Sequence, residues 1–249
     1  MDLVTCNFSK LRVIKSFSFA EVVITIGIIG IVAAMTLPSL IQKQQKYVLE
    51  KNFKVVYSLL LNAIRMAESV HGEAKYWQYY NENLTTPQNT TLFSETYLIP
   101  FLNDIHVYNG AKLHGCKNIT YKDRSGMVVT CNSVIGFCGT CRSGGANLTQ
   151  IYLPNGAIIV PMVRPKIVYG GAGGVEIDVD INGYKGPNVF GRDVFRFFIS
   201  RYSKYNLAGT MVPYQTRSQK LMSCKSDALW GCAAIIIEDG FKFSDEYPW

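Results

Sequence analysis

The sequence predicts an α+β protein in which a long N-terminal helix, first transmembrane and then amphipathic, packs on an antiparallel β-sheet head that contains disulfides. Three observations carry this prediction. An uncharged apolar run covers 22–40, helical spacing of apolar residues resumes beyond it, and β-branched runs separated by turn residues fill the second half of the chain. The predicted parts are a leader (1–16), a transmembrane helix (17–40), an amphipathic continuation of the helix (41–72) and a globular head (73–249).

The apolar run fits one membrane-spanning helix. Roughly 20 residues at about 1.5 Å of rise per residue cross a hydrocarbon core of about 30 Å, and a helix satisfies its own backbone hydrogen bonds there. Small residues along the run let a second helix approach closely. They are Gly27, Gly30, Ala33 and Ala34.

One carboxylate, that of Glu21, interrupts this apolar sequence, where a bare charge is costly and marks a candidate functional residue. Phe17 lies four residues before it, and a cut between Ser16 and Phe17 would create an α-amine whose charge can pair with the carboxylate. The leader is basic, which predicts a cytoplasmic N-terminus and an exported head. Its charged residues are Asp2, Lys10, Arg12 and Lys15.

Lys15-Ser16-Phe17, followed by Glu21 and later by Pro38, resembles the N-terminal signature of type IV pilins and type II secretion pseudopilins. The resemblance implies that a prepilin peptidase cleaves between Ser16 and Phe17 and then methylates the new amine of Phe17. It also implies that Glu21 pairs with the terminal amine of a neighbouring subunit during assembly. The family usually has glycine where this chain has Ser16, so a small residue is kept at the cleavage position.

By this resemblance the chain is a structural subunit, a pilin or a pseudopilin, and not an enzyme. It would be a single-pass protein of the bacterial inner membrane with an exported head, and later part of a periplasmic or cell-surface filament. Its partners would be the prepilin peptidase, other pilin subunits, the inner-membrane assembly platform and the membrane. Two stretches, 180–195 and 231–241, carry a less specific resemblance to heads of a bacterial pilin-like group.

Two other interpretations stay open. A minor pilin could capture DNA or a surface, in keeping with a formal net charge of +7 for the whole chain. An exported soluble protein would use 22–32 as the apolar part of an ordinary signal peptide, cleaved after Ala34. The charge at Glu21 and the amphipathic helix beyond the run argue against a signal peptide. The sequence contains no Gly-x-Ser-x-Gly, His-Glu-x-x-His or phosphate-loop motif.

Beyond Pro38, apolar residues at helical spacing make one face of the helix a packing surface, so the proline is expected to kink the helix rather than end it. Gly72 is the expected C-terminal stop. Residues 76–91 are predicted as a loop and 92–105 as a short second helix.

From residue 109 the pattern is that of β-strands. Asn155-Gly156 lies between two of the apolar runs and predicts a hairpin. Apolar and acidic residues alternate over 175–181, which predicts a half-buried strand. The predicted strands cover 127–130, 150–153, 157–163, 175–181 and 233–237, and a further apolar run lies at 194–199.

Six cysteines follow the leader, and an even number in an exported chain predicts disulfides. They are Cys116, Cys131, Cys138, Cys141, Cys224 and Cys232. Six cysteines allow about fifteen pairings, so the residues alone leave the connectivity open. A redox motif or a zinc site at Cys138 and Cys141 is an alternative that fits an exported protein less well. Pilin heads commonly carry a C-terminal disulfide loop, so the resemblance implies a bond between Cys224 and Cys232.

One segment suggests a cofactor, calcium. Asp178, Asp180 and Asn182 alternate as hard oxygen ligands, as in the first half of a calcium loop. Val189 occupies the place of the usual bidentate glutamate, and Asp193 could instead close a site of another kind. The alternative is a strand that ends in a turn made by an Asp or Asn side chain.

Overall fold

The computed structural model describes residues 18–109, 120–129, 149–164, 174–200, 216–226 and 230–249. The chain divides into two compact units, Met1–Gln45 and Lys46–Trp249, and we call the second one the head unit. The helices are α1 (Phe19–His71), α2 (Thr86–Tyr97), α3 (Arg217–Ser226) and α4 (Cys232–Glu238). The strands are β1 (His106–Tyr108), β2 (Gln150–Tyr152), β3 (Ile158–Arg164), β4 (Gly174–Asp180) and β5 (Val194–Ser200). Short 3₁₀ turns lie at Ala74–Tyr76, Ile99–Phe101 and Gly183–Lys185.

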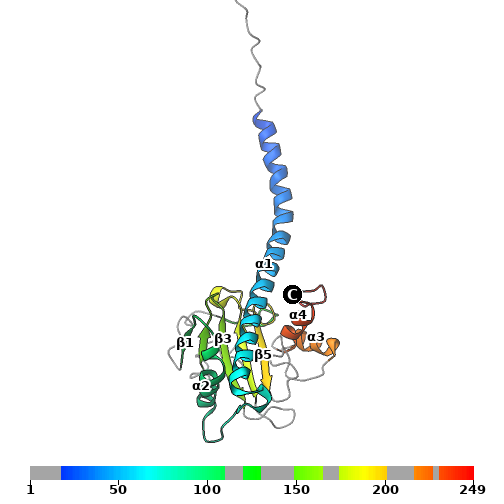
Figure 1. Ribbon diagram of the computed structural model, residues 1–249. Helices are drawn as coiled ribbons and strands as arrows, with labels where there is room; N and C mark the ends of the chain where they lie inside the picture. Colours follow the sequence, from blue (N-terminus) through cyan, green and yellow to red (C-terminus); the bar gives the residue numbers. More distant parts are fainter. Residues whose placement is uncertain (1–17, 110–119, 130–148, 165–173, 201–215, 227–229) are drawn as a thin grey trace, which may run out of the picture. The chain divides into compact units, whose positions relative to one another are not determined.

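The helix α1 is the longest element and begins the described chain (Figure 1). It continues through Pro38, as the resumed apolar spacing predicts. Gly72 follows its last residue with φ of 80°, a left-handed conformation that favours glycine, so the predicted stop is confirmed. By length and composition alone, α1 is apolar enough to cross a membrane.

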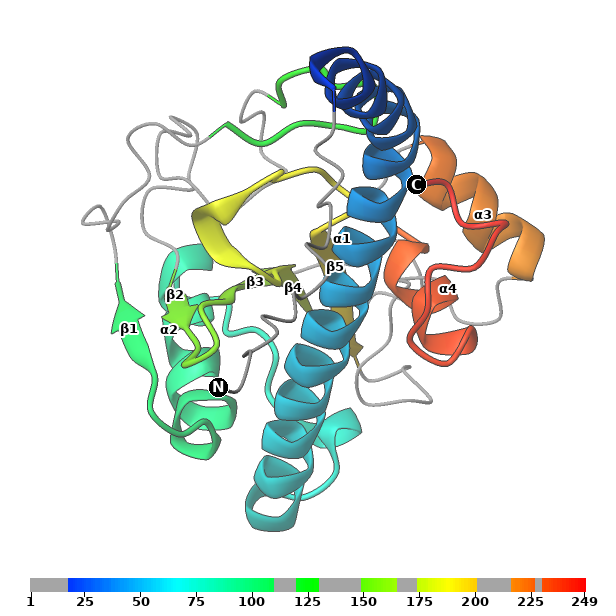
Figure 2. The same cartoon turned by 90° about the horizontal axis from the view of Figure 1, so that it is seen from above.

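Within the head unit, one side of α1 packs against the sheet (Figure 2). The Phe53 ring lies edge-on to Phe195, with 4.8 Å between ring centroids, and 5.7 Å from Phe197. Burial of such rings removes a large apolar area from water and is a major contribution to the stability of the core. The buried side chains of α1 are those of Leu49, Phe53, Val56, Leu60, Ala63, Ile64 and Ala67.

Among the described residues, five strands form one antiparallel sheet in the order β1-β2-β3-β4-β5. The strands predicted at 150–153, 157–163 and 175–181 are confirmed as β2, β3 and β4. The predicted hairpin joins β2 to β3, and the Gly156 amide donates a hydrogen bond to the Leu153 carbonyl (2.9 Å). The helix α2 packs on β3, whereas α4 lies beside β5 (Figure 1).

The second helix begins earlier than predicted. The side chains of Thr85 and Gln88 each bond the backbone amide of the other, which forms a capping box that starts α2. The loop predicted at 76–91 therefore contains half of this helix. The helix predicted at 92–105 is also wrong in its second half, because α2 ends at Tyr97 and is followed by a 3₁₀ turn and by β1.

The final strand predicted at 233–237 is wrong, because this segment is the helix α4. Gly231 turns the chain with φ of 86°, and the helix begins at the next residue. The residues from Cys232 to Ile236 are all buried, so packing outweighs the strand preference of the isoleucines. Periodicity cannot distinguish a short buried helix from a short buried strand. The strand predicted at 127–130 is wrong over its described part, where Val128 forms only an isolated bridge with Lys122.

The strand β4 is buried on both faces, rather than half-buried as predicted. Its apolar residues face the core that contains α1, whereas its acidic residues Glu176, Asp178 and Asp180 are at most 6% exposed on the other face. Residues distant in sequence cover this second face, which is why the local pattern does not reveal its burial. Tyr121 and Phe190, from outside the five strands, pack there with Ile158, Val160, Met162 and Val194, which are cross-strand neighbours of the acids.

Candidate functional site: the start of the long helix and the buried charges of the head

The helix α1 begins with a capping box made by Ser18 and Glu21. The Ser18 hydroxyl accepts a hydrogen bond from the Glu21 amide (3.3 Å), and the Glu21 carboxylate accepts from the amide (2.8 Å) and hydroxyl (3.0 Å) of Ser18. The helix dipole favours a negative charge at this end. Sequence reasoning missed this cap, although the spacing Ser-x-x-Glu is its usual signal. Ser16 and Phe17, the predicted cleavage residues, lie outside the described residues.

The apolar run of α1 has no cover from the described part of the protein. From residue 22 to residue 40 every side chain is exposed except that of Ala33, which is half-buried. The large apolar side chains range from 41% exposed at Val22 to 76% at Met35. A continuous apolar surface of this extent indicates contact with lipid or with another protein.

A second set of exposed apolar residues lies on α1 within the head unit, and we call it the outer stripe. Its members are between 37% and 65% exposed, in contrast to the buried residues that face the sheet. Their spacing alternates between seven and four residues, which keeps them on one side of a helix. The outer stripe consists of Val48, Val55, Leu59, Met66 and Val70.

Four charged side chains meet on the face of the sheet opposite α1, across strands β3, β4 and β5. Arg196 is 2% exposed and binds Asp178 through two hydrogen bonds, from Nε (2.5 Å) and Nη2 (2.8 Å). Its Nη1 lies 3.4 Å from the Glu176 carboxylate, which also accepts a hydrogen bond from Arg164 at 2.9 Å. The Arg196 guanidinium lies 5.1 Å from the centre of the Trp230 ring. The acidic residues of β4 are therefore paired inside the protein rather than solvated.

The structure places the candidate calcium ligands in two different settings. Asp178 is engaged by Arg196, whereas Asp180, Asn182 and Asp193 are neighbours at the end of β4. The backbone amide of Asn182 donates a hydrogen bond to the Asp180 carboxylate at 3.3 Å. This is the turn made by an Asp or Asn side chain, the alternative to a calcium loop. No group of three or more His, Cys, Asp or Glu side chains that could hold a metal ion exists among the described residues. Among the described residues, the four candidate ligands therefore do not form one group of this kind, and calcium binding stays a prediction.

Asp180 and Asp193 instead form a pair of buried acids. Asp193 accepts hydrogen bonds from the amides of Asn188 (2.8 Å) and Val189 (2.7 Å), and Asp180 accepts one from the Tyr121 hydroxyl (3.0 Å). Burial, with a contribution from the charge of Asp193, raises the pKa of Asp180 from 3.8 to about 8. Burial also raises the pKa of Asp193. Near neutral pH, Asp180 is therefore largely protonated.

This raised pKa predicts a pH dependence of stability that Asp180→Asn removes. The folded state holds the proton more tightly than the unfolded state, so the contribution of Asp180 to stability is present below about pH 4 and is lost as the pH rises towards about 8. Between pH 5 and pH 8, the free energy of unfolding of the native chain should therefore fall by on the order of 2–4 kcal/mol relative to that of Asp180→Asn. Urea unfolding of the full chain in detergent micelles measures this difference. Asp245→Asn, at an exposed acid, is the control, and an equal pH profile for all three proteins would contradict the prediction.

Cys224 and Cys232 form a disulfide, which joins α3 to α4 and has 4.7 Å between the Cα atoms. Both cysteines are fully buried. The other four cysteines after the predicted leader, Cys116, Cys131, Cys138 and Cys141, lie outside the described residues. The disulfide closes a small loop and holds two short helices together.

Loss of this bond is expected to destabilise the head unit. For a loop of this length, the loss of chain entropy in the unfolded state corresponds to about 2–3 kcal/mol, so Cys224→Ser should lower the free energy of unfolding by that amount and increase proteolysis. Met222→Ser, at a 65% exposed position of the same helix, is the matched control. Non-reducing peptide mapping checks the pairing itself, and finding Cys224 free or joined to one of the four earlier cysteines would refute it.

These features define an α+β protein with an N-terminal helix that is long and apolar enough to cross a membrane and with a disulfide-containing head unit. The chain belongs to DUF6613, which is described as a family of unknown function, and the family model matches residues 39–249. No curated protein and no solved structure matches the chain.

Proposed function

We propose that this chain is a structural subunit, a pilin or pseudopilin, of a type IV pilus-like or type II secretion filament. One observation carries the proposal most directly. The uncharged, exposed apolar run of α1 continues without a break into the part of the same helix that packs on the head sheet. The carboxylate of Glu21 lies in the first turn of α1, just before this run. An ordinary signal peptide requires neither the carboxylate nor the amphipathic continuation.

Glu21 is the assembly residue in this proposal. Its carboxylate already accepts a hydrogen bond from the Ser18 amide, one residue after Phe17. Cleavage before Phe17 would place a positive charge next to this site in each subunit. Pairing of the Glu21 carboxylate with the amine of a neighbouring subunit would neutralise two charges inside an apolar filament core, where each alone is costly.

The apolar run would have two successive environments. Before assembly it would lie in the inner membrane, with the head exported. During assembly the contacts with lipid would be replaced by contacts with the same segment of other subunits, and the small residues from Gly27 to Ala34 would permit close approach of helices. The outer stripe would add apolar contacts between subunits at the level of the head.

The required partners follow from this cycle: a prepilin peptidase that cleaves and N-methylates, an inner-membrane assembly platform that extracts the subunit, and other pilin subunits. The proposal is tested by isolating filaments, sheared from the cell surface or pelleted from the periplasm, and searching them for the chain by mass spectrometry. We expect to find the chain in them. Recovery of the chain only as a soluble monomer without its apolar segment would contradict it.

A further inference from the structure

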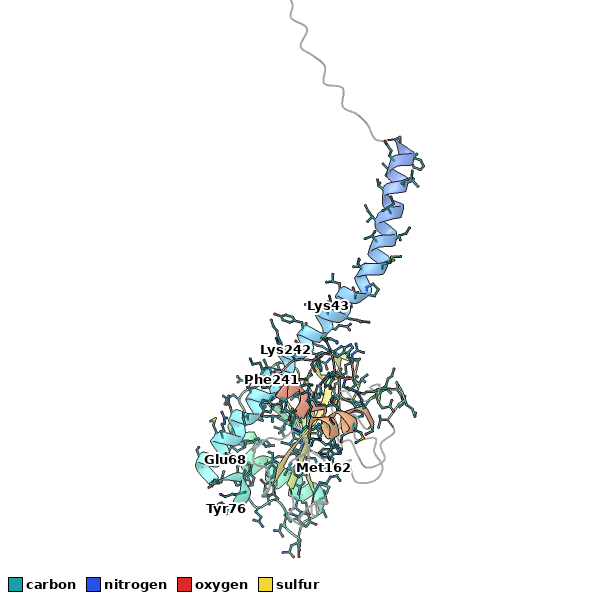
Figure 3. The ribbon with its side chains drawn as sticks, turned by 90° about the vertical axis from the view of Figure 1, so that its right-hand side faces the viewer. Lys43, Glu68, Tyr76, Met162, Phe241 and Lys242 are labelled. Carbon is teal, nitrogen blue, oxygen red and sulfur yellow. A yellow bond between two sulfur atoms is a disulfide. The ribbon has the colours of Figure 1, made fainter. Side chains whose placement is uncertain are left out.

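The C-terminal residues of the chain run along the part of α1 that belongs to the head unit, from Tyr57 towards Lys46. Phe241 and Lys242 lie beside the part of α1 that belongs to the head unit (Figure 3). Three contacts give the direction of this C-terminal segment: the Phe241 ring lies 5.4 Å from Tyr57, the Phe243 amide donates to Glu50 at 2.8 Å, and the Trp249 ring lies 4.9 Å from the Lys46 ammonium. Trp249 is therefore held against the first residue of the head unit.

Trp249 contacts two cations. The Lys46 ammonium and the Arg192 guanidinium lie 4.9 Å and 4.6 Å from the centre of its ring, within the range of a cation–π interaction. The Trp249 side chain remains half-buried, so part of the ring reaches the surface. Lys51 on α1 and Lys242 on the C-terminal segment are further exposed cations of the same two segments.

Three acidic residues, Glu50, Asp245 and Glu246, lie in the same two segments and lower the net positive charge of this surface. Glu50 accepts the hydrogen bond from the Phe243 amide, and Glu246 is paired with Arg217 at 3.0 Å. Asp245 is exposed. The surface therefore combines four cations with an aromatic ring at the end of the head unit that is nearest in sequence to the apolar run.

The position of this surface along the chain matches the headgroup layer of a bilayer. Lys46 follows Leu40 by six residues, or about 9 Å of helix. The polar layer on each side of a bilayer is roughly 5–8 Å thick, and a lysine side chain can extend several ångströms further. Tryptophan is enriched at this depth, and clustered cations bind acidic lipids there.

We propose that Trp249, Lys46 and Arg192 form a binding surface for the headgroups of acidic phospholipids in the membrane that holds the apolar run. This inference rests on the proposed membrane-stored subunit and adds the class of lipid that it contacts. The tryptophan ring enters the interface while the two cations bind lipid phosphates. The contact holds the head against the bilayer until extraction breaks it.

The test uses the full chain in nanodiscs that carry lipid brominated on the acyl chain, which quenches nearby tryptophan fluorescence. One set of nanodiscs contains phosphatidylcholine alone, and the other contains phosphatidylcholine and phosphatidylglycerol. Subtracting the signal of a Trp249→Phe variant isolates the emission of Trp249. We expect Trp249 to be quenched in the nanodiscs that contain phosphatidylglycerol. The quenching should be at least about twofold weaker in nanodiscs of phosphatidylcholine alone, in about 0.5 M salt, or in the Lys46→Glu variant. Lys75→Glu, in the 3₁₀ turn that follows α1, should leave it unchanged.

Equal quenching in both lipids, or an equal effect of Lys46→Glu and Lys75→Glu, would overturn the inference. Absence of Trp249 quenching in a chain that co-elutes with the nanodiscs would also overturn it, while leaving the membrane-anchored subunit intact. Failure of the chain to associate with any nanodisc would instead contradict the proposed function, and this inference with it.

Discussion

Glu21→Ala is expected to leave cleavage after Ser16 and membrane insertion intact, and to reduce incorporation into filaments at least about tenfold, which corresponds to about 1.4 kcal/mol. In the proposed filament, the substitution would leave the α-amine of Phe17 without a carboxylate partner in an apolar core. An unpaired charge in such surroundings costs several kcal/mol, so the tenfold figure is a lower bound. Quantitative mass spectrometry of the membrane fraction and of sheared filaments measures the amounts of membrane-inserted and filament-incorporated chain.

Loss of the capping box at the start of α1 would also explain a loss of filaments in Glu21→Ala. The Glu21→Gln variant separates loss of the cap from loss of the charge. Glutamine at this position can still accept the hydrogen bonds of Ser18 and cap the helix, but it carries no charge. If charge pairing governs assembly, Glu21→Gln should fail as Glu21→Ala does. Normal filaments from Glu21→Gln would assign Glu21 to helix capping alone. Glu82→Ala, at an acid in the head unit, is the control and should assemble normally.

Arg196→Met is expected to lower the free energy of unfolding by about 3–5 kcal/mol, because it leaves the buried carboxylate of Asp178 without its cation. A loss of this size is a large part of the about 5–15 kcal/mol that holds a typical domain folded. Glu176 keeps its bond to Arg164, so Asp178 carries most of the cost. Urea unfolding of the full chain in detergent micelles, followed by near-ultraviolet circular dichroism, measures the loss.

Arg217→Met is the matched control for this buried arginine. Arg217 also binds carboxylates, those of Asp239 and Glu246, but its side chain is 38% exposed, so its pairs should contribute at most about 1 kcal/mol. Combining Arg196→Met with Asp178→Val should recover part of the loss, because the uncompensated charge is removed with its partner. Equal losses from Arg196→Met and Arg217→Met would show that the buried pair has no special role.

The parts of the fold that could be predicted are those with a local signal. The uncharged run before Leu40, the periodicity beyond Pro38 and the Asn155-Gly156 turn each identify their element without reference to the rest of the chain. The errors at α2 and α4 have two different causes. The capping box of α2 is a local signal that competes with the loop-like composition of 76–91, whereas α4 is helical because its isoleucines are buried among distant residues.

Of the candidate functional residues, only those that stand out from their sequence neighbours could be predicted. Glu21 is conspicuous because an acid precedes an uncharged run, and this is visible in the sequence alone. The sequence predicts a half-buried strand and a calcium loop for the acids of β4, because it does not show that Arg196 lies opposite Asp178 on the next strand. Strand register brings these two together, and the Trp230 ring packs against the Arg196 guanidinium.

The mass of the mature N-terminus, measured on chain recovered from membranes or filaments, tests the proposed processing most directly. We predict a terminal peptide that begins at Phe17 and carries one added methyl group. This result requires cleavage on the cytoplasmic side of the apolar run, which keeps the run in the mature subunit. A terminus at Met35 would show cleavage by an ordinary signal peptidase, remove the apolar run from the mature protein and contradict assembly through Glu21.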